Sequence, residues 1–270
     1  MDGAADGAWN MAVDEAILEG YAASRPVHLA PTLRLYSWSP PALSLGRRQA
    51  ASHDPAFLER EGLDLVRRPT GGAAVLHEHE RTYAVVGLLR HPPFPGGVLE
   101  TYRTIAAALE LALRDLGVDA RAVGPRQVSR SAEASRLCFG ETSHHEIAAG
   151  ATKLVGSAQL RRRGAFLQHG SILMRADADR VARAMGAPVP PRGRFAGIED
   201  VLDRSVPASE LDRALRHAFA ESLGLELHPG ELTPEECALA ARWASSKYRA
   251  RAWTIEGRDV REGGTLSAER

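Results

Sequence analysis

The chain has 270 residues, of which 44% are hydrophobic and 25% charged, a mix typical of globular proteins. Its 34 basic and 34 acidic residues cancel, which argues against a nucleic-acid-binding protein that depends on a basic surface. No apolar run reaches the roughly 18 residues of a membrane span, and the acidic first residues are unlike a signal peptide. Two cysteines are too few for a disulfide framework, so we expect a cytoplasmic protein.

The first part of the chain predicts short strands with helices between them. Asn10 is a suitable cap for a helix over 11–23, and Pro55 stands at the first position of a helix over 55–61. Alternation of apolar and polar residues predicts strands. We expect these at 32–38, 42–45, 63–66, 74–76 and 82–89.

The second part contains the most regular helix, over 99–116, which Gly117 closes. Three successive antiparallel strands are predicted at 146–149, 153–161 and 165–174. Helices follow at 177–185, 207–223 and 233–245, the last with a capping box of Thr233 and Glu236. The elements show no regular strand–helix–strand rhythm, so we predict an α+β fold with a mixed, mostly antiparallel sheet flanked by helices.

Several common catalytic motifs are missing from the sequence. It has no glycine-rich dinucleotide motif, no phosphate-binding loop, no serine-hydrolase elbow and no zinc-protease helix. Cys138 and Cys237 stand 99 residues apart, and His77 and His79 have no evident third ligand. We therefore predict no metal site. Cys237, on an expected helix, is interpreted as a core residue.

The first notable segment is Arg67-Arg68-Pro69-Thr70-Gly71-Gly72-Ala73, followed by His77. A strand ends there, and two glycines allow the backbone to approach a ligand closely. Such a turn suits an acyl chain or a phosphate held by backbone N–H groups. The residues alone also permit an ordinary hairpin turn.

The second notable segment surrounds Lys153, one of only two lysines in a chain whose other basic residues are arginines. A lysine can lose its proton and change its pKa where an arginine cannot, so this choice suggests chemistry. In a regular strand Lys153, Ser157 and Gln159 share one face, and the next strand carries His169-Gly170. A polar row of this kind indicates either a ligand site or a solvent-facing strand.

Cys138 lies in a short apolar stretch, Leu137 to Phe139, upstream of Lys153. A buried structural cysteine is one interpretation. The other is a nucleophile whose thiolate a nearby cation stabilises, and Lys153 on a neighbouring strand is a candidate for that cation. Spacing alone leaves both open.

Together these segments resemble the lipoate–protein ligase/octanoyltransferase superfamily. The resemblance includes the helix start at Asn10 to Ala16 and the Lys247-Tyr248 to Trp253 ending, and it extends from Asn10 to Thr254. Within the superfamily, Cys138 placed before the Lys153 strand resembles the LipM-type octanoyltransferases. The resemblance implies the catalytic fold shared with biotin protein ligases, over residues 10–224. It leaves 225–270 as a C-terminal helical extension and tail packed on the same domain.

The resemblance also implies a reaction. Octanoyl would pass from the phosphopantetheine thioester of acyl carrier protein to Cys138, and then to a lysine of a lipoyl domain or of the glycine-cleavage H protein. Lys153 would stabilise the Cys138 thiolate and polarise the acyl carbonyl. No cofactor beyond the donor's phosphopantetheine is implied, and a monomer is expected. The implied substrate-binding residues are Arg68, Gly71, Gly72, Ala73, His77, Ser157, Gln159, His169 and Gly170.

Some positions depart from the family pattern, and other functions stay open. Ala73 replaces a third glycine, His144-His145 stands where a small residue and an aromatic are common, and Glu78 rather than Asp follows the motif histidine. An ATP-dependent lipoate–protein ligase would need the glycine turn and Lys153 but not Cys138. An amidotransferase that moves octanoyl between lipoyl proteins, or an inactive acyl-binding module, are further alternatives.

Overall fold

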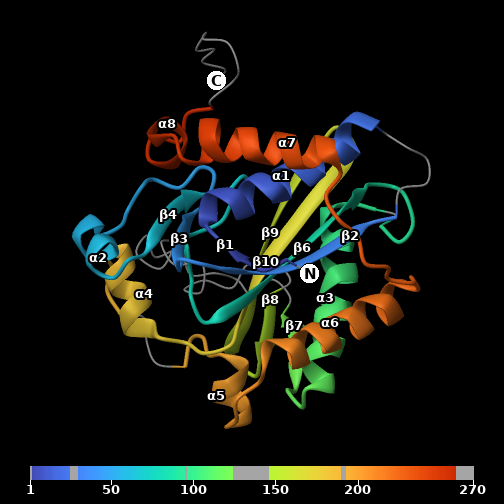
Figure 1. Ribbon diagram of the computed structural model, residues 1–270. Helices are drawn as coiled ribbons and strands as arrows, with labels where there is room; N and C mark the ends of the chain where they lie inside the picture. The colour runs from blue at the N-terminus through green and yellow to red at the C-terminus, as the bar shows by residue number, and fades with distance from the viewer. Residues whose placement is uncertain (1, 25–29, 95, 124–145, 190–192, 260–270) are drawn as a thin grey trace.

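A computed structural model of the chain describes residues 2–24, 30–94, 96–123, 146–189 and 193–259. Its centre is a seven-stranded sheet with the order β1-β2-β6-β10-β9-β8-β7 (Figure 1). Within it β1 pairs with β2 in parallel, and the other neighbours are antiparallel. The strands are β1 (Ala4–Ala5), β2 (Thr32–Trp38), β6 (Glu80–Leu88), β7 (Ala120–Val123), β8 (Glu146–Ala149), β9 (Thr152–Arg162) and β10 (Ala165–Leu173).

A second sheet of three strands has the order β4-β3-β5. Its strands are β3 (Ala42–Leu45), β4 (Asp64–Arg67) and β5 (Val75–His77), with β3 parallel to β4 and antiparallel to β5. Two short helices, α2 (Pro55–Arg60) and α4 (Ala178–Met185), accompany this sheet on the left of Figure 1. The predicted α+β class with a mostly antiparallel sheet is confirmed.

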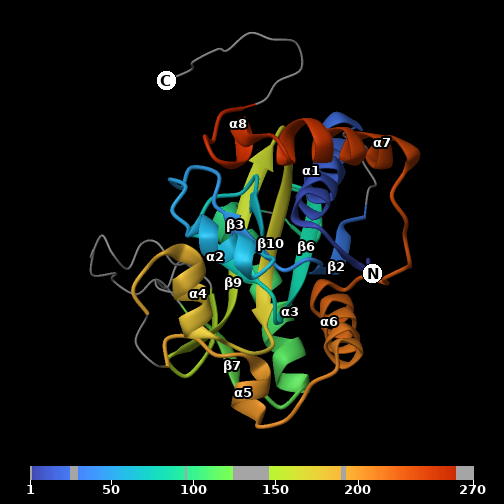
Figure 2. The same ribbon diagram turned by 60° about the vertical axis from the view of Figure 1, so that its left-hand side comes forward.

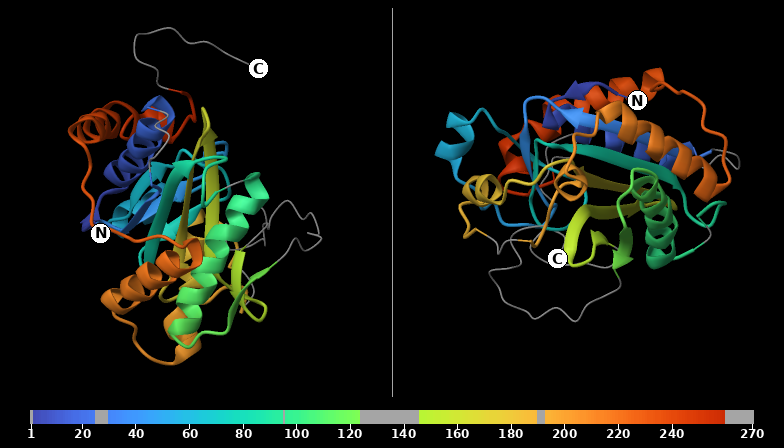
Figure 3. Two further views of the ribbon diagram at one scale, coloured as in Figure 1. Left: turned by 90° about the vertical axis from the view of Figure 1, so that its right-hand side faces the viewer. Right: turned by 90° about the horizontal axis from the view of Figure 1, so that it is seen from below.

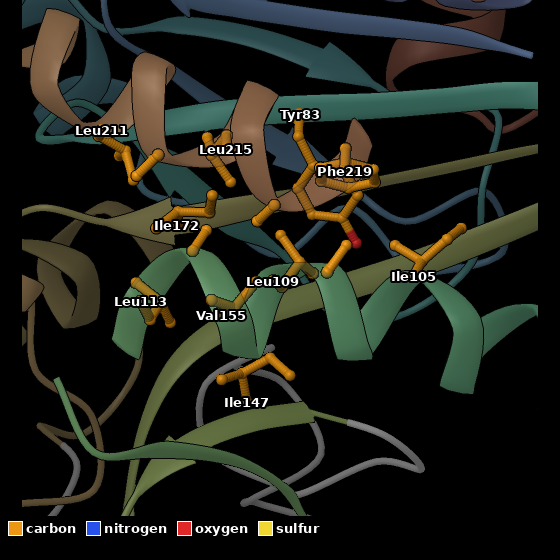
Figure 4. Close-up of a cluster of buried hydrophobic side chains, with 14 of the residues drawn as sticks. Tyr83, Ile105, Leu109, Leu113, Ile147, Val155, Ile172, Leu211, Leu215 and Phe219 are labelled. Atoms are coloured by element: carbon orange, nitrogen blue, oxygen red, sulfur yellow. The ribbon is translucent and has the colours of Figure 1, made fainter. Parts of the chain in front are cut away.

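Helices cover the large sheet on two sides. In Figure 3, strands run between α1 and α7 on one side and α3 on the other. The bounds are α1 (Gly7–Ser24), α3 (Val98–Asp115), α6 (Ala208–Leu223) and α7 (Pro234–Trp243). Figure 4 shows the core between α3, α6 and the sheet, where Leu109 and Leu215 are fully buried. No helix among the described residues is long and apolar enough to cross a membrane.

The chain continues past α7 into a π-helical turn, η2 (Ala244–Tyr248), and a short helix, α8 (Arg251–Thr254). The turn η2 packs against α1, and α8, at the top of Figure 2, packs against β4. The capping box predicted for α7 is present, since Glu236 N donates to Thr233 Oγ1 at 3.1 Å and Thr233 N donates to Glu236 Oε2 at 2.8 Å. The remaining helix is α5 (Ile198–Leu202).

Most predicted elements lie within two residues of their observed bounds, but two expectations about single residues were wrong, and some short elements were not predicted. Helix α1 begins at Gly7, so Asn10 is not its cap. Its buried side-chain amide instead donates to the carbonyl oxygens of Ala5 and Ser37, both at 3.0 Å. Cys237 is exposed on α7 rather than buried in the core. Strand β7 was not predicted, because its four residues carry too short a pattern.

Candidate functional site

A cavity lies between the two sheets. Its empty space is about 350 Å³ together with its opening to solvent. Elements from distant parts of the sequence contribute to it, including α1, β2, β5, β9 and β10. The lining residues are Met11, Tyr36, Trp38, Ser44, Arg68, Val75, His77, Thr82, Gly156, Ser157, Ala158, His169, Gly170 and Ser171.

His77 lies at the end of β5 and stacks on Trp38, with ring centroids 3.9 Å apart and an interplanar angle of 17°. Its Nε2 lies 2.9 Å from Ser44 Oγ. Burial lowers the pKa of His77, and the carboxylate of Glu80, 3.6 Å from Nδ1, does not offset this effect. The imidazole is therefore neutral near pH 7 and offers the cavity a flat, weakly polar wall.

A hydroxyl group binds the indole N–H of Trp38. Its indole N–H donates to Thr82 Oγ1 at 2.8 Å, and this hydroxyl donates in turn to the buried carboxylate of Glu80. The ring cannot turn away from the cavity without leaving the indole N–H unpaired. His77 and Trp38 thus form one rigid, uncharged surface.

His169, in the middle of β10, connects a helix with the glycine-containing turn. Its Nδ1 lies 2.9 Å from Asp14 Oδ2 on α1, and its Nε2 lies 2.6 Å from Thr70 Oγ1. The Asp14 carboxylate accepts from Nδ1–H, and Nε2 bonds to the Thr70 hydroxyl. These two hydrogen bonds fix the orientation of a side chain that lines the cavity.

Asp14 is itself completely buried and receives two further donors. Arg34 Nη1 donates to Oδ1 at 2.7 Å, and the hydroxyl of Tyr36 donates to Oδ2 at 2.8 Å. Burial alone would raise the pKa of Asp14, but the charge of Arg34 and the bond to His169 outweigh it and lower the pKa. A fixed negative charge therefore lies behind the imidazole.

The glycine turn between β4 and β5 folds around the Arg68 side chain. Arg68 Nη2 donates to the carbonyl oxygens of Gly71 and Ala73, both at 2.7 Å, and Nη1 donates to the carbonyl oxygen of Ser44 at 3.1 Å. Gly72 has a positive φ of 90°, a conformation that favours glycine. The guanidinium thus keeps the turn in a fixed shape beside the cavity.

Only glycine fits at position 170 without a steric clash. A Cβ there would lie 2.6 Å from the carbonyl oxygen of Gly156 and 2.6 Å from the Tyr83 ring. Ser157 on the neighbouring strand places its hydroxyl 2.7 Å from the Tyr83 hydroxyl, and burial raises the pKa of Tyr83 to about 12. This floor of the cavity is closely packed and uncharged.

Gln159 lies beyond the cavity. Its amide donates to Gln168 Oε1 at 3.0 Å, and it accepts a hydrogen bond from Arg161 at 2.8 Å. Gln159 is not one of the lining residues. Its contacts are those of a polar network at the far end of β9.

The regular strand pattern predicted that Lys153 and Ser157 share a face of β9, and this prediction was wrong. The pairing of β8 with β9 shifts by one residue, from Ile147–Val155 to Ala148–Lys153, and Leu154 and Val155 both pack into the core beside α3. A bulge of this kind reverses the alternation of side chains. Lys153 instead forms a buried ion pair with Glu146, and it is not among the cavity-lining residues that the structure describes.

Cys138, its neighbours Leu137 to Phe139, and His144-His145 lie outside the described residues. Within the described part of the chain, no group of three or more metal-ligating side chains comes together. His79 points to Arg175, and Glu78 pairs with Arg180 at 2.6 Å, so this cluster contributes only His77 to the cavity.

Several residues of the site were not predicted from the sequence. Asp14 and Thr70 bind His169, Ser44 binds His77, and Tyr36 and Trp38 complete the wall. Thr70 lay within the quoted turn, and Asp14 within the quoted start of α1. The polar groups of Thr70 and Asp14 were the only sign of a role for these residues. No sequence spacing connects them with His169, which lies 99 or more residues later.

Comparison with known proteins identifies relatives over almost the whole chain. The sequence matches the family of the Lipoyl protein ligase A/B catalytic domain over residues 6–220. It is 42% identical over 265 residues to the octanoyltransferase LipM of Kyrpidia tusciae, covering 93% of this chain and 95% of the relative. The octanoyltransferase LipM of Carboxydothermus hydrogenoformans is 37% identical over 258 residues, covering 92% and 94%.

Solved structures agree with these relatives. A lipoate-protein ligase A bound with ATP superimposes with a TM-score of 0.77 at 27% identity, covering 94% of this chain and 99% of that one. A protein of T. acidophilum with bound lipoic acid superimposes with a TM-score of 0.75 at 27% identity, covering 95% and 100%. The fold and the sequence therefore lead to the same group of proteins.

Proposed function

The chain belongs to the Lipoyl protein ligase A/B catalytic domain family, and from this membership we propose that it is an octanoyltransferase of lipoate biosynthesis. The observation that carries the proposal is the 42% identity to an octanoyltransferase LipM over 93% of the chain. The donor is octanoyl-acyl carrier protein, and the acceptor is a lysine of a lipoyl domain or of the glycine-cleavage H protein. The reaction takes place in the cytoplasm, and the enzyme acts as a monomer without a resident cofactor.

The cavity suits a saturated eight-carbon chain. Trp38, His77 and Val75 offer apolar or uncharged surface, and the nearest charges, on Asp14 and Arg68, are already paired with protein groups. An acyl chain that displaces water from these walls gains hydrophobic stabilisation. The bound lipoic acid in the T. acidophilum protein is also a chain of this class.

The transfer proceeds in two balanced steps. The thiolate of Cys138 attacks the donor's carbonyl carbon, a new C–S bond forms, and the phosphopantetheine thiolate leaves and takes up the proton that Cys138 lost. The neutral amine of the acceptor lysine then attacks the acyl-enzyme. A C–N bond forms, the C–S bond to Cys138 breaks, and the amine proton passes to the thiolate.

The family resemblance assigns Lys153 a role in both steps, although it is not among the described cavity-lining residues. Its ammonium, held by Glu146, stabilises the thiolate and the oxyanion that develops on the carbonyl oxygen. Exchange of one thioester for another is nearly isoenergetic, and conversion of a thioester to an amide is downhill. The route therefore requires no ATP.

Intact-protein mass spectrometry tests this proposal. Wild type, Cys138→Ser and Cys237→Ala are incubated with octanoyl-acyl carrier protein without ATP. We expect a hydroxylamine-sensitive octanoyl adduct on wild type and on Cys237→Ala, whose changed cysteine is exposed on α7, but none on Cys138→Ser.

A second function is favoured by the likeness to a ligase bound with ATP. If no adduct forms, and a lipoyl domain is modified only when lipoate and ATP are added, the protein is a ligase. Transfer from an octanoylated H protein but not from acyl carrier protein would instead make it an amidotransferase.

A further inference from the structure

The C-terminal segment (residues 246–257) lies behind the cavity and supplies none of the lining residues that the structure describes. It nevertheless binds two residues that are direct sequence neighbours of site residues. Glu15 directly follows Asp14, and Arg67 directly precedes Arg68. The segment therefore contacts two elements that contribute to the site, α1 next to Asp14 and β4 next to Arg68.

On α1 the contact is a buried ion pair. Lys247 Nζ donates to Glu15 Oε2 at 2.6 Å, and the hydroxyl of Tyr248 donates to the same oxygen at 2.5 Å. Arg162 donates to the other oxygen at 2.7 Å. The Lys247 ammonium also lies 3.9 Å from the centre of the Trp253 ring, which adds a cation–π contact. Glu15 is 1% exposed and Lys247 8%, so neither charge is solvated by water.

The π-helical turn η2 explains how two consecutive side chains reach one carboxylate oxygen. An ordinary α-helix turns 100° per residue, and the wider π-turn brings neighbouring side chains closer in direction. Such turns often occur at functional sites. Here the turn directs Lys247 and Tyr248 together at Glu15.

At the glycine turn the contact is made by Arg67, which is 1% exposed. Its Nε donates to the carbonyl oxygens of Trp253 at 2.9 Å and Thr254 at 3.1 Å. The indole N–H of Trp253 donates back to the carbonyl oxygen of Arg67 at 2.7 Å. This reciprocal pair fixes the last residue of β4, directly before the Arg68 that shapes the turn.

We propose that the C-terminal segment is a positioning element of the acyl site, in which Lys247 and Trp253 hold α1 and the glycine turn so that Asp14 keeps its place behind His169 and Arg68 its place beside the cavity. The proposal rests on the octanoyl-transfer function above. Lys247 and Trp253 act through Glu15 and Arg67 and do not touch the substrate. Shifts of about an ångström in such supporting contacts are enough to weaken substrate binding strongly.

The test separates positioning from mere stability with two variants. Lys247→Met leaves Glu15 buried without its ammonium, so its Tm should fall by several degrees. Glu15→Gln combined with Lys247→Met removes both charges, and Arg162 keeps its second carboxylate partner, Glu19. The Tm of the double variant should therefore return close to that of wild type. We expect the double variant to keep its kcat within twofold but to show a KM for octanoyl-acyl carrier protein raised on the order of tenfold.

Leu215→Ala is the matched control, because Leu215 is fully buried in the core between α3 and α6, away from the cavity. It should lower the Tm at least as much as Lys247→Met and leave KM unchanged. If KM of the double variant returns to the wild-type value together with its Tm, the segment is only structural and the proposal is overturned.

Binding of octanoate, measured by calorimetry on the same proteins, distinguishes this failure from failure of the proposed function. If wild type binds octanoate but transfers no octanoyl, the transfer function fails. A weaker Kd of the double variant then still supports positioning, and an unchanged Kd overturns it. If wild type neither binds octanoate nor transfers octanoyl, both proposals are overturned.

Discussion

The Nδ1 atom of His169 lies 2.9 Å from the Oδ2 atom of Asp14, which joins the middle of β10 to the first helix at the wall of the cavity. Asp14 is fully buried, and Arg34 and Tyr36 complete its set of donors. This pair makes the orientation of a cavity-lining imidazole depend on a carboxylate 155 residues earlier.

Asp14→Asn tests this dependence. The change leaves Arg34 buried without its full ion pair, so the free energy of unfolding should fall by about 3 kcal/mol at pH 7. Octanoyl transfer should also fall, because the His169 imidazole loses the carboxylate that orients it. Urea unfolding and a transfer assay measure the two effects. The control Glu210→Gln removes an exposed partner of Arg204 and should leave the unfolding free energy nearly unchanged.

The difference in unfolding free energy between wild type and Asp14→Asn should depend on pH with a definite sign. The pKa of Asp14 is lower in the folded protein, since Arg34 and His169 outweigh burial. Its stabilisation is therefore complete above the unfolded value of roughly 3.9 and is lost as the pH falls through the folded value. The gap between wild type and Asp14→Asn should narrow only below about pH 4. A gap that already closes at pH 6 would contradict this account.

Gly72→Ala should disrupt the turn. Gly72 has a φ of 90°, and a Cβ there would lie 2.9 Å from the Arg68 guanidinium that braces the turn. We expect a loss of about 1–3 kcal/mol in stability and a raised KM for the octanoyl donor. Gly71→Ala is the control, because Gly71 has no positive φ and no atom within 4 Å of the added Cβ. Equal effects of the two changes would contradict a specific requirement for glycine at position 72.

Because of His77, the free energy of unfolding should fall when the pH is lowered from 7.5 to 5. Burial lowers the pKa of His77 in the folded state, so the unfolded chain binds its proton more readily. The stabilising contribution is present above the unfolded value of roughly 6.5 and is lost as the pH falls below it. Wild type should thus lose more unfolding free energy than His77→Gln between pH 7.5 and pH 5. Parallel curves for the two proteins would show that His77 stays accessible to protons.

Lys153→Arg keeps a positive charge but should reduce the rate of adduct formation by about 10²-fold. The site of Lys153 is buried against Glu146, and a planar guanidinium is larger and bonds in a different geometry from an ammonium. Quenched reactions analysed by mass spectrometry give the rate. Arg163→Lys, at a side chain that is 64% exposed, serves as the control. Near-normal rates for Lys153→Arg would remove Lys153 from the mechanism.

The order and type of the elements could be predicted because they depend on local patterns. The strand at 32–38 and the capping box of Thr233 and Glu236 were found as predicted, since alternation and capping act between residues close in sequence. The misplaced cap at Asn10 shows the limit of such rules. Its amide has tertiary partners on β1 and β2, and these contacts replace the local capping bond.

The candidate site could be predicted only in part. The turn with Arg68 and the residues His77, His169 and Gly170 were expected beside one ligand, and all four line or border one cavity. The expected face shared by Lys153 and Ser157 was wrong, because a bulge in β9 depends on the pairing partner β8 and leaves no sign in the sequence of β9 itself. The assignments of Cys138 and of each residue's role remain predictions.

The sequence by itself determined the mixed fold class, the glycine-containing turn and the family motifs, because backbone preferences and hydrophobic periodicity are properties of neighbouring residues. Only the tertiary structure decided that Asp14 binds His169, that Thr70 completes this chain, and that Lys247 pairs with Glu15. Each of these contacts joins residues at least 99 positions apart. A buried charge or imidazole stabilises the protein only when its partner is held within hydrogen-bonding distance, and packing of whole elements determines that distance.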